Sequence, residues 1–280
     1  MEMKDKQYEQ QQFGFGAGPR NHRLRRGIYL LPSIFTVANM LCGFYAVLAV
    51  VKGEPADLDY AARAIGFAIL FDAFDGFVAR ATNTNTEFGK QFDSLADVVS
   101  FGIAPAVLAY AWGVRGMRTE DAIQAHHIYQ LGWFVSLAFV VCCAWRLARF
   151  NVHGMAPGGS RYFVGMPTPA AAGLIAATVH AFRTPLDNWR WAAGWLGLVL
   201  VAAALMVSAI RFRSFKDIPW ARRQPSLMIV LIASLVGLIV VYSEIVLMLL
   251  ASIYTVSGIV FHVVRVVRHR PASQTSQQTS

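Results

Sequence analysis

Long apolar stretches alternate along this chain with short polar segments that carry most of its charge. A helix needs about 20 apolar residues to cross roughly 30 Å of hydrocarbon. Windows that have about this length and contain no Asp, Glu, Lys or Arg are 27–51, 98–114, 122–145, 162–182, 191–210, 224–243 and 245–264. The pattern therefore predicts a chain that crosses a membrane several times as helices.

An eighth stretch, 60–82, has the apolar length but also carries Arg63, Asp72, Asp75 and Arg80. Cytoplasmic loops of membrane proteins collect Lys and Arg, which tests whether it spans. If it spans and the N-terminus is cytoplasmic, 19 basic residues lie inside and 6 outside. If it does not span, the split becomes 10 inside and 15 outside. We therefore predict an all-α, polytopic bundle of about eight transmembrane helices with both termini in the cytoplasm.

Composition agrees with this fold class. Hydrophobic residues make up 56% of the chain and charged residues 15%, which excludes a soluble domain and a disordered chain. The net charge of +9 comes from residues between apolar windows, which argues against nucleic-acid binding. We expect polar tails at 1–19 and 266–280 around one transmembrane domain over 20–265, whose helices carry any chemistry. Cys42, Cys142 and Cys143 have no spacing typical of disulfides or zinc.

The acids of the eighth stretch form the first candidate site. Charged groups inside a span are costly unless they have partners or a water-filled cavity, so they mark functional sites by default. At about 100° per residue, Asp72 and Asp75 share one helix face with Gly76, Ala79 and Arg80. The small residues on this face would let a bulky ligand approach the backbone, or would equally let another helix pack closely.

The next helix begins near residue 88 and places Gly89, Asp93 and Asp97 on one stripe, because they are four residues apart. A short polar turn, TNTNTE at 82–87, joins the two helices on the cytoplasmic side. The antiparallel pair can therefore bring four carboxylates together. Converging anions repel one another unless cations neutralise them, and Mg²⁺ or Mn²⁺ suits oxygen ligands best. Such ions commonly serve phosphate chemistry.

Two other interpretations of these acids stay open at this point. They can be solvated charges at helix ends, paired with Arg80 and Lys90. They can also belong to a transporter that carries protons or cations. A transporter usually places ionisable groups near the midplane and often shows inverted repeats, whereas these acids lie near one face and no repeat is visible.

The spacing of the acids resembles a known family. Asp72-x2-Asp75-Gly76-x2-Ala79-Arg80-x8-Gly89-x3-Asp93-x3-Asp97 matches the full signature of the CDP-alcohol phosphatidyltransferases. The segments at 27–46, 92–108, 146–151 and 165–173 are similar to bacterial, membrane-spanning members that use serine as acceptor. The resemblance covers about residues 20–265 and implies location in a bacterial inner membrane with a cytoplasmic active site, and a homodimer.

The resemblance also implies a reaction and roles for its residues. The phosphatidyl group would pass from CDP-diacylglycerol to the hydroxyl of L-serine, with release of CMP. Asp72, Asp75 and Asp93 would ligate a metal centre, while Asp97 would contact a second metal and act as general base. The donor-binding residues would be Asp72, Gly76, Ala79, Arg80 and Gly89. Other acceptors, such as glycerol phosphate, inositol phosphate or choline, remain alternatives.

The acceptor site is predicted from charge. Serine carries a carboxylate, which an arginine fork binds well. Arg146 and Arg149, with Asn151 beside them, lie near the cytoplasmic end of the fourth helix and are candidates. Both arginines can equally be membrane anchors. In the first window, Thr36 and Asn39 can approach the donor, although a hydrogen bond between helices is the simpler interpretation.

Overall fold

The computed structural model describes residues 22–82, 86–117, 122–153, 162–208, 210–213, 234 and 237–268. Its α-helices are α2 (His22–Lys52), α3 (Pro55–Thr82), α4 (Glu87–Asp97), α5 (Ala104–Tyr110), α6 (Ala122–His153), α7 (Thr168–Phe182), α8 (Trp189–Val207) and α10 (Ser243–Arg268). Two π-helical segments, η1 (Val98–Ile103) and η2 (Ala111–Arg115), and two short strands, β1 (Tyr162–Val164) and β2 (Arg211–Arg213), complete the described elements. The predicted tail 1–19 and most of the window 224–243 lie outside them.

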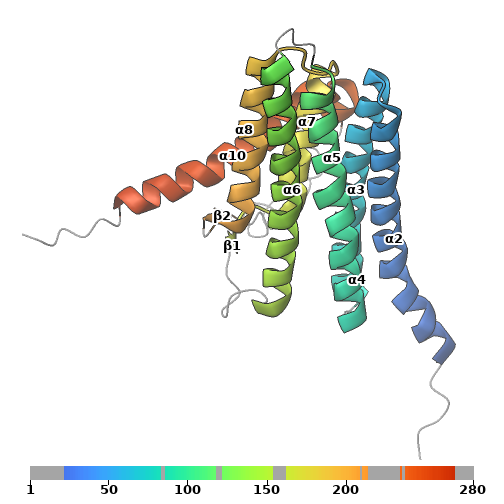
Figure 1. The fold of residues 1–280 in the computed structure, drawn as a ribbon. Coiled ribbons are helices and arrows are strands. Elements are labelled where there is room, and N and C mark those ends of the chain that lie inside the picture. Colours follow the sequence, from blue (N-terminus) through green and yellow to red (C-terminus); the bar gives the residue numbers. More distant parts are fainter. Residues whose placement is uncertain are drawn as a thin grey trace, which may run out of the picture.

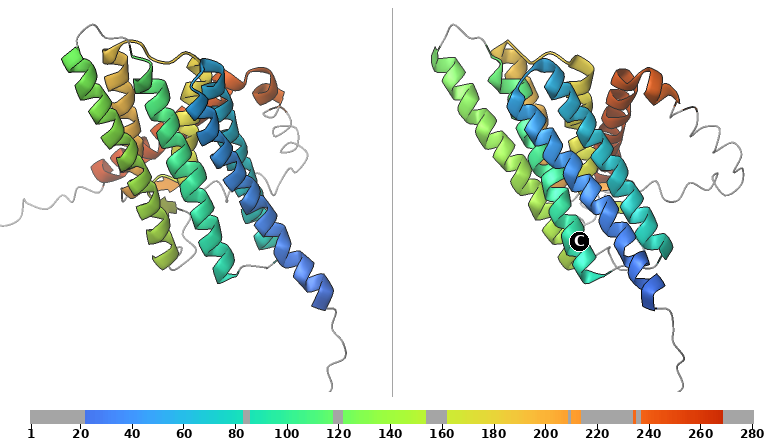
Figure 2. Two further views of the ribbon diagram at one scale, coloured as in Figure 1. Left: turned by 45° about the vertical axis from the view of Figure 1, so that its right-hand side comes forward. Right: turned by 90° about the vertical axis from the view of Figure 1, so that its right-hand side faces the viewer.

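The acid-bearing helix α3 runs antiparallel to α2 along the same length of the bundle (Figures 1 and 2). Its 28 residues give it a length of about 42 Å at 1.5 Å per residue, enough to cross a bilayer. The charges that α3 carries distinguish it from the apolar helices beside it. The structure therefore gives α3 the size and direction that the distribution of basic residues requires.

Five helices in the described part are long and apolar enough to cross a membrane. They are Ile34–Lys52, Glu87–Arg115, His126–Val152, Trp189–Val207 and Ser243–Phe261. Helix α7, at 15 residues, is apolar but shorter. The predicted all-α, multi-pass membrane bundle is confirmed, while the total of eight spanning helices stays a prediction.

The predicted window 162–182 is wrong at its beginning. Residues Tyr162–Val164 form β1, which pairs antiparallel with β2, and helix α7 begins only at Thr168. Gly165 has φ +83°, and an added Cβ there would lie 2.3 Å from the Met206 carbonyl oxygen. Glycine at this turn and Pro167 before the helix both oppose a helical backbone, which explains why the apolar pattern misled.

The second acid-bearing helix, α4, is the beginning of a long continuous helical rod. Helix α4 continues through η1, α5 and η2, so Glu87–Arg115 forms a single path across the bundle. The change from α- to π-helical bonding follows Asp97 directly, and the Ala104 N–H donates to the Val99 carbonyl five residues back. Such wide turns occur often at functional sites because they re-aim neighbouring side chains.

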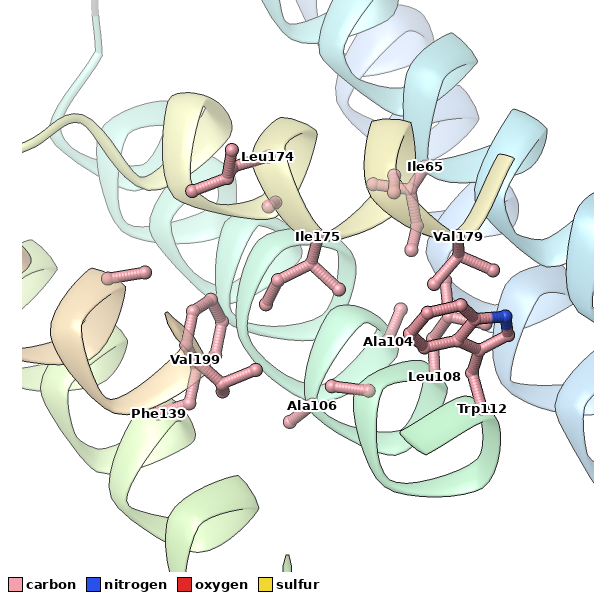
Figure 3. Close-up of a cluster of buried hydrophobic side chains, with 14 of the residues drawn as sticks. Ile65, Ala104, Ala106, Leu108, Trp112, Phe139, Leu174, Ile175, Val179 and Val199 are labelled. Atoms are coloured by element: carbon pink, nitrogen blue, oxygen red, sulfur yellow. The ribbon is translucent and has the colours of Figure 1, made fainter. Parts of the chain in front are cut away.

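The apolar core lies around this rod. Figure 3 shows Ala104, Leu108 and Trp112 of the rod near Val179 of α7 and Ile65 of α3. On its other side, Phe139 of α6 and Val199 of α8 close the cluster, which also contains Ala106, Leu174 and Ile175. The core therefore fixes α4 and its acids relative to the helices around them.

Helix α10 lies at a steep angle to the other helices in each view (Figures 1 and 2). A polar network ties its first turn to the bundle. His180 of α7 is buried, its Nδ1 bonds Asp59 of α3, and its Nε2 lies 2.8 Å from Ser243 Oγ. Arg63 pairs with Asp59 at 2.8 Å. No pattern in the sequence indicates this role for His180.

Candidate functional site

The two acid-bearing helices meet at a short connection whose ends are well defined. Helix α3 ends at Thr82, where the hydroxyl donates to the Val78 carbonyl at 2.8 Å. Helix α4 begins at Glu87, and Thr86 caps it by accepting a 3.0 Å hydrogen bond from the Gly89 N–H. Threonine is a favoured N-cap because its hydroxyl satisfies a free backbone donor. The helices therefore end and begin where the predicted turn at 82–87 requires. Residues 83–85 of this turn lie outside the described residues.

Three of the four predicted carboxylates converge. One oxygen each from Asp72, Asp93 and Asp97 lies within 4.8 Å of the other two. Asp97 is buried, and the other two are half-buried. The four-residue spacing on α4 and the facing position on α3 produce this cluster, as the helical periodicity predicts. Within the described residues, these are the acids that come close enough to share one ion.

Asp75, the fourth acid, lies beside the three clustered acids and also contacts α2. Its carboxylate is close enough to Asp93 of α4 to interact with it electrostatically, and its Oδ2 accepts a 2.7 Å hydrogen bond from Thr36 Oγ1. Asp75 is buried. Because one Asp75 oxygen is occupied by Thr36, the side chain has a fixed orientation beside the other acids.

A second polar residue of α2 holds Asp97. Asn39 is fully buried, and its Nδ2 donates to Asp97 Oδ1 at 3.2 Å. Ser100 Oγ in turn donates to the Asn39 carbonyl at 2.9 Å. These contacts need close helices: a Cβ on Gly43 would lie 2.4 Å from Ser100 Oγ. The interhelical interpretation of Thr36 and Asn39 is confirmed, and α2 forms a third wall of the site.

The donor atoms of the cluster fit a divalent cation. Asp75 Oδ1 and Asp93 Oδ1 are buried, yet neither receives a hydrogen bond from a described residue. Buried carboxylate oxygens nearly always have a partner. The cluster combines several carboxylates, oxygens without hydrogen-bond partners and few contacts to positive charge. This combination matches the all-oxygen sites that hard divalent cations prefer.

The basic residues nearby do not pair with these acids directly. Lys90 bonds Glu87 at 2.6 Å, in the first turn of its own helix. Arg80 is close enough to Asp72 to interact electrostatically, but in the described part of the chain it forms no ion pair within 4.0 Å of the four acids. The alternative interpretation, in which Arg80 and Lys90 neutralise the acids as simple helix-end pairs, is not what the structure contains.

The small residues beside the acids differ in their surroundings. A Cβ added to Gly76 would meet the Arg80 guanidinium at 3.4 Å, and no other described group comes as near. No atom of another described helix lies within 4 Å of that Cβ, so at Gly76 the described structure fits the interpretation in which a ligand can approach the backbone. Ala79 is half-buried on the same helix. A Cβ on Gly89 would touch Thr86 Oγ1 at 3.0 Å, within the helix cap.

The three acceptor candidates separate in the structure. Arg146 of α6 interacts electrostatically with Asp97, and its Nη1 lies 3.4 Å from Thr168 Oγ1. Arg149 is exposed and reaches the Val207 carbonyl at 3.4 Å. Asn151 donates to Ser94 Oγ of α4 at 2.9 Å. Arg146 alone among them is placed beside the carboxylate cluster.

Comparison with known proteins adds a family to this geometry. The model of the CDP-alcohol phosphatidyltransferase family matches residues 29–203, which include most of α2, both acid-bearing helices and most of α8. The matched span therefore contains every carboxylate of the cluster and the Arg146 side chain.

Individual relatives carry one name in several organisms. A CDP-diacylglycerol–serine O-phosphatidyltransferase of Helicobacter pylori is 34% identical over 199 residues, covering 69% of this chain and 76% of the relative. A protein of the same name from Mycobacterium tuberculosis is 34% identical over 62% of this chain and 57% of its own length. One from Saccharomyces cerevisiae is 33% identical over 62% of each. The chain belongs to the CDP-alcohol phosphatidyltransferase family.

Proposed function

We propose that this protein is a phosphatidylserine synthase, which transfers the phosphatidyl group of CDP-diacylglycerol to the hydroxyl of L-serine and releases CMP. The observation that carries the proposal is the convergence of Asp72, Asp93 and Asp97 within 4.8 Å on two helices of a membrane bundle. The relatives named above, which bear the name of this activity, support the choice of donor and acceptor.

The acids are proposed to hold divalent metal, Mg²⁺ or Mn²⁺. Asp72, Asp75 and Asp93 would bind one ion, and Asp97 would contact a second. The orphaned Asp75 Oδ1 and Asp93 Oδ1 supply oxygens for this purpose. When bound, the metal would neutralise the diphosphate of the donor and the CMP that leaves. Thr36 would keep Asp75 in the orientation that this requires.

Asp97 is proposed as the general base. The serine oxygen forms a bond to the phosphorus that carries diacylglycerol, and the bond from that phosphorus to the oxygen of CMP breaks. The serine hydroxyl proton moves to Asp97. Asn39 donates to Oδ1 of this residue, so Oδ2 is the oxygen that would accept the proton. Positioned bases of this kind contribute roughly 10²- to 10⁴-fold to the rate. Asp93 would assist from one helical turn away.

The open face of α3 is proposed to receive the cytidine diphosphate. Gly76 leaves space for the nucleotide to lie against the helix, because among the described residues an added Cβ there would meet Arg80 alone within 4 Å. Ala79 extends this face by one turn, and the Arg80 guanidinium would bind phosphate oxygens. Gly89 would give room on α4. Asp72 borders the same space.

The acceptor carboxylate is proposed to bind Arg146, which lies nearest to Asp97 of the three candidates. Arg149 and Asn151 would act from the rim, since both side chains contact other parts of the bundle. An arginine fork suits a carboxylate better than a lysine does, because it donates two parallel hydrogen bonds.

We place the protein in a bacterial inner membrane with its active site and both termini toward the cytoplasm, and we expect a homodimer. The basic excess on the side where α2 begins supports the orientation, since that side also carries the α3–α4 connection. One transmembrane catalytic domain over 20–265, between tails at 1–19 and 266–280, completes the proposal. Cross-linking in native membranes tests the dimer.

The test of the activity is an acceptor panel. Purified protein receives CDP-diacylglycerol, Mn²⁺ or Mg²⁺, and one alcohol at a time, and CMP release is followed. Serine should give the fastest release and the lipid product phosphatidylserine. Release with glycerol phosphate, inositol phosphate or choline but not with serine would instead assign another acceptor. A protein that releases no CMP but moves protons or cations across vesicles would be a transporter.

A further inference from the structure

Arg146 interacts with Asp97 on one side and with Thr168 on the other. It is half-buried in α6, and its Nε is buried without a hydrogen-bond partner in the described residues. No described carboxylate lies within 4.0 Å of its guanidinium, although Asp97 is near enough to attract it. A guanidinium whose Nε is buried, and which has no ion pair among the described residues, is energetically costly, so binding of an anion beside it is favourable.

Thr168 is the second component of this place. It is 1% exposed at the start of α7, and its Oγ1 is the contact of Arg146 Nη1 at 3.4 Å. Because the oxygen accepts from arginine, the hydroxyl hydrogen points elsewhere, and no described residue accepts it. A carboxylate in contact with Arg146 would supply that acceptor.

The backbone before Thr168 is held rigidly. The Gly165 N–H donates to the Ile210 carbonyl at 2.8 Å, and the Met166 N–H donates to the Leu205 carbonyl at 2.9 Å. Pro167 then begins the helix, with its carbonyl accepting from the Ala171 N–H at 3.1 Å. The strand pair therefore fixes the Thr168 hydroxyl at one position in front of Arg146.

Tyr254 of α10 is a further polar residue near Arg146. It is half-buried and interacts electrostatically with Arg146. Helix α10 crosses the bundle at a steep angle and packs against α7 and β2 (Figures 1 and 2). This course brings Tyr254 near Arg146. Residues from three helices, far apart in sequence, thus surround one guanidinium.

We infer that Thr168 and Tyr254, together with Arg146, form the subsite for the acceptor's carboxylate and thereby select serine over amino alcohols that lack one. This inference rests on the proposed function. Thr168 donates to one carboxylate oxygen, Arg146 binds the other, and Tyr254 restricts the width of the subsite. The hydroxyl of the bound serine then lies toward Asp97, the member of the carboxylate cluster that interacts with Arg146.

The test compares serine with ethanolamine, which is serine without its carboxylate. In Thr168→Val, the KM for serine should rise about tenfold to a hundredfold, as for loss of a hydrogen bond to a charged group. The KM for CDP-diacylglycerol should stay within about twofold, and the preference for serine over ethanolamine should fall by the same factor as the serine kcat/KM. Tyr254→Ala, which removes the ring and widens the subsite, should shift the preference in the same direction.

Matched controls separate this role from a structural one. Thr178→Val removes a hydroxyl on the same helix that bonds its own backbone at Leu174, and it should leave both KM values unchanged. Thr168→Ser keeps the hydroxyl and should retain the serine KM. If wild-type protein releases no CMP with serine, the proposed function fails. If it does, and Thr168→Val keeps the wild-type preference for serine or changes both KM values equally, the subsite is overturned alone.

Discussion

At the scale of single residues, the site depends on two polar side chains that are not themselves acids. Thr36 and Asn39 each occupy one oxygen of a carboxylate, Asp75 and Asp97 respectively. A carboxylate with one oxygen bonded can turn less freely, which keeps the other oxygen aimed at its task. Both residues therefore position the acids rather than react.

Asn39→Ala should lower serine-dependent CMP release by roughly tenfold to a hundredfold, because Asp97 loses a hydrogen bond to its charged form. The Mn²⁺ concentration needed for half-maximal activity should rise as well, which a purely structural role would not predict. Titrating Mn²⁺ in the CMP assay measures both. Asn188→Ala, which removes the N-cap of α8 instead, is the control and should keep the wild-type metal requirement.

The acids themselves were predictable at this scale, and their partners were not. The four acids stand at helical spacings that put them on facing stripes, so the convergence of Asp72, Asp93 and Asp97 follows from periodicity. The rotation of α2 about its own axis is set by packing, which single-sequence patterns do not contain. The hydrogen bond from Asn39 to Asp97 joins residues that are 58 positions apart. From the sequence, a hydrogen bond between helices was therefore one of two possible roles for Asn39, and its partner could not be named.

At the scale of elements, the approach of α2 to η1 holds the site together. Gly43 faces Ser100 so closely that an added Cβ would lie 2.6 Å from the Ser100 Cα. Backbone atoms cannot move aside as a flexible side chain can. The same contact places Asn39, one helical turn earlier, beside Asp97.

Gly43→Ala should therefore lower the free energy of unfolding by about 1–3 kcal/mol, the usual effect of overpacking, and should reduce activity. Thermal unfolding in detergent checks this. Gly66→Ala is the matched control, because no described atom lies within 4 Å of an added Cβ there. It should leave the melting temperature unchanged or raise it, since alanine favours helix. Equal melting temperatures for the two variants would contradict a tight α2–η1 contact.

The attachment of α10 depends on a different set of contacts. His180 bridges Asp59 and Ser243, and Arg183 pairs with Glu244 beside it. Helix α10 has many apolar side chains on its outer surface, so this polar network is a large part of what fixes its beginning. The sequence pattern cannot indicate this role for His180, because its partner Asp59 lies 121 residues away.

His180→Ala should lower the melting temperature, because it leaves buried Asp59 with one fewer partner, an effect of about 1–3 kcal/mol. It should also raise the KM for serine if α10 carries Tyr254 to Arg146 as inferred. His126→Ala, at an exposed position, serves as the control. An unchanged melting temperature in His180→Ala would show that apolar packing alone holds α10.

At the scale of the whole molecule, the charge distribution and the helix order agree. The count of basic residues required 60–82 to span, and α3 does run antiparallel to α2 over a spanning length. The apolar pattern alone was less reliable where backbone chemistry intervened, as at Gly165 and Pro167, where a strand and turn replace the expected helix. Hydropathy reports burial in lipid, whereas local turns depend on single residues.

Sidedness can be measured with single cysteines in a variant that lacks Cys42, Cys142 and Cys143. A maleimide that cannot cross membranes should label Glu54→Cys on intact cells, because the proposed orientation puts this residue, which lies between α2 and α3, on the outer side. Thr86→Cys, between α3 and α4, should react only after the membrane is opened. Labelling of both on intact cells would contradict a spanning α3, and the reverse pattern would contradict the orientation.

The central claim is that the carboxylate cluster performs phosphatidyl transfer to serine, and Asp97→Asn tests it most directly. The substitution keeps the shape of the side chain but removes its capacity to accept a proton. Serine-dependent CMP release should fall at least a hundredfold, while the melting temperature and the binding of CDP-diacylglycerol stay close to wild type. Full activity in Asp97→Asn would contradict the account.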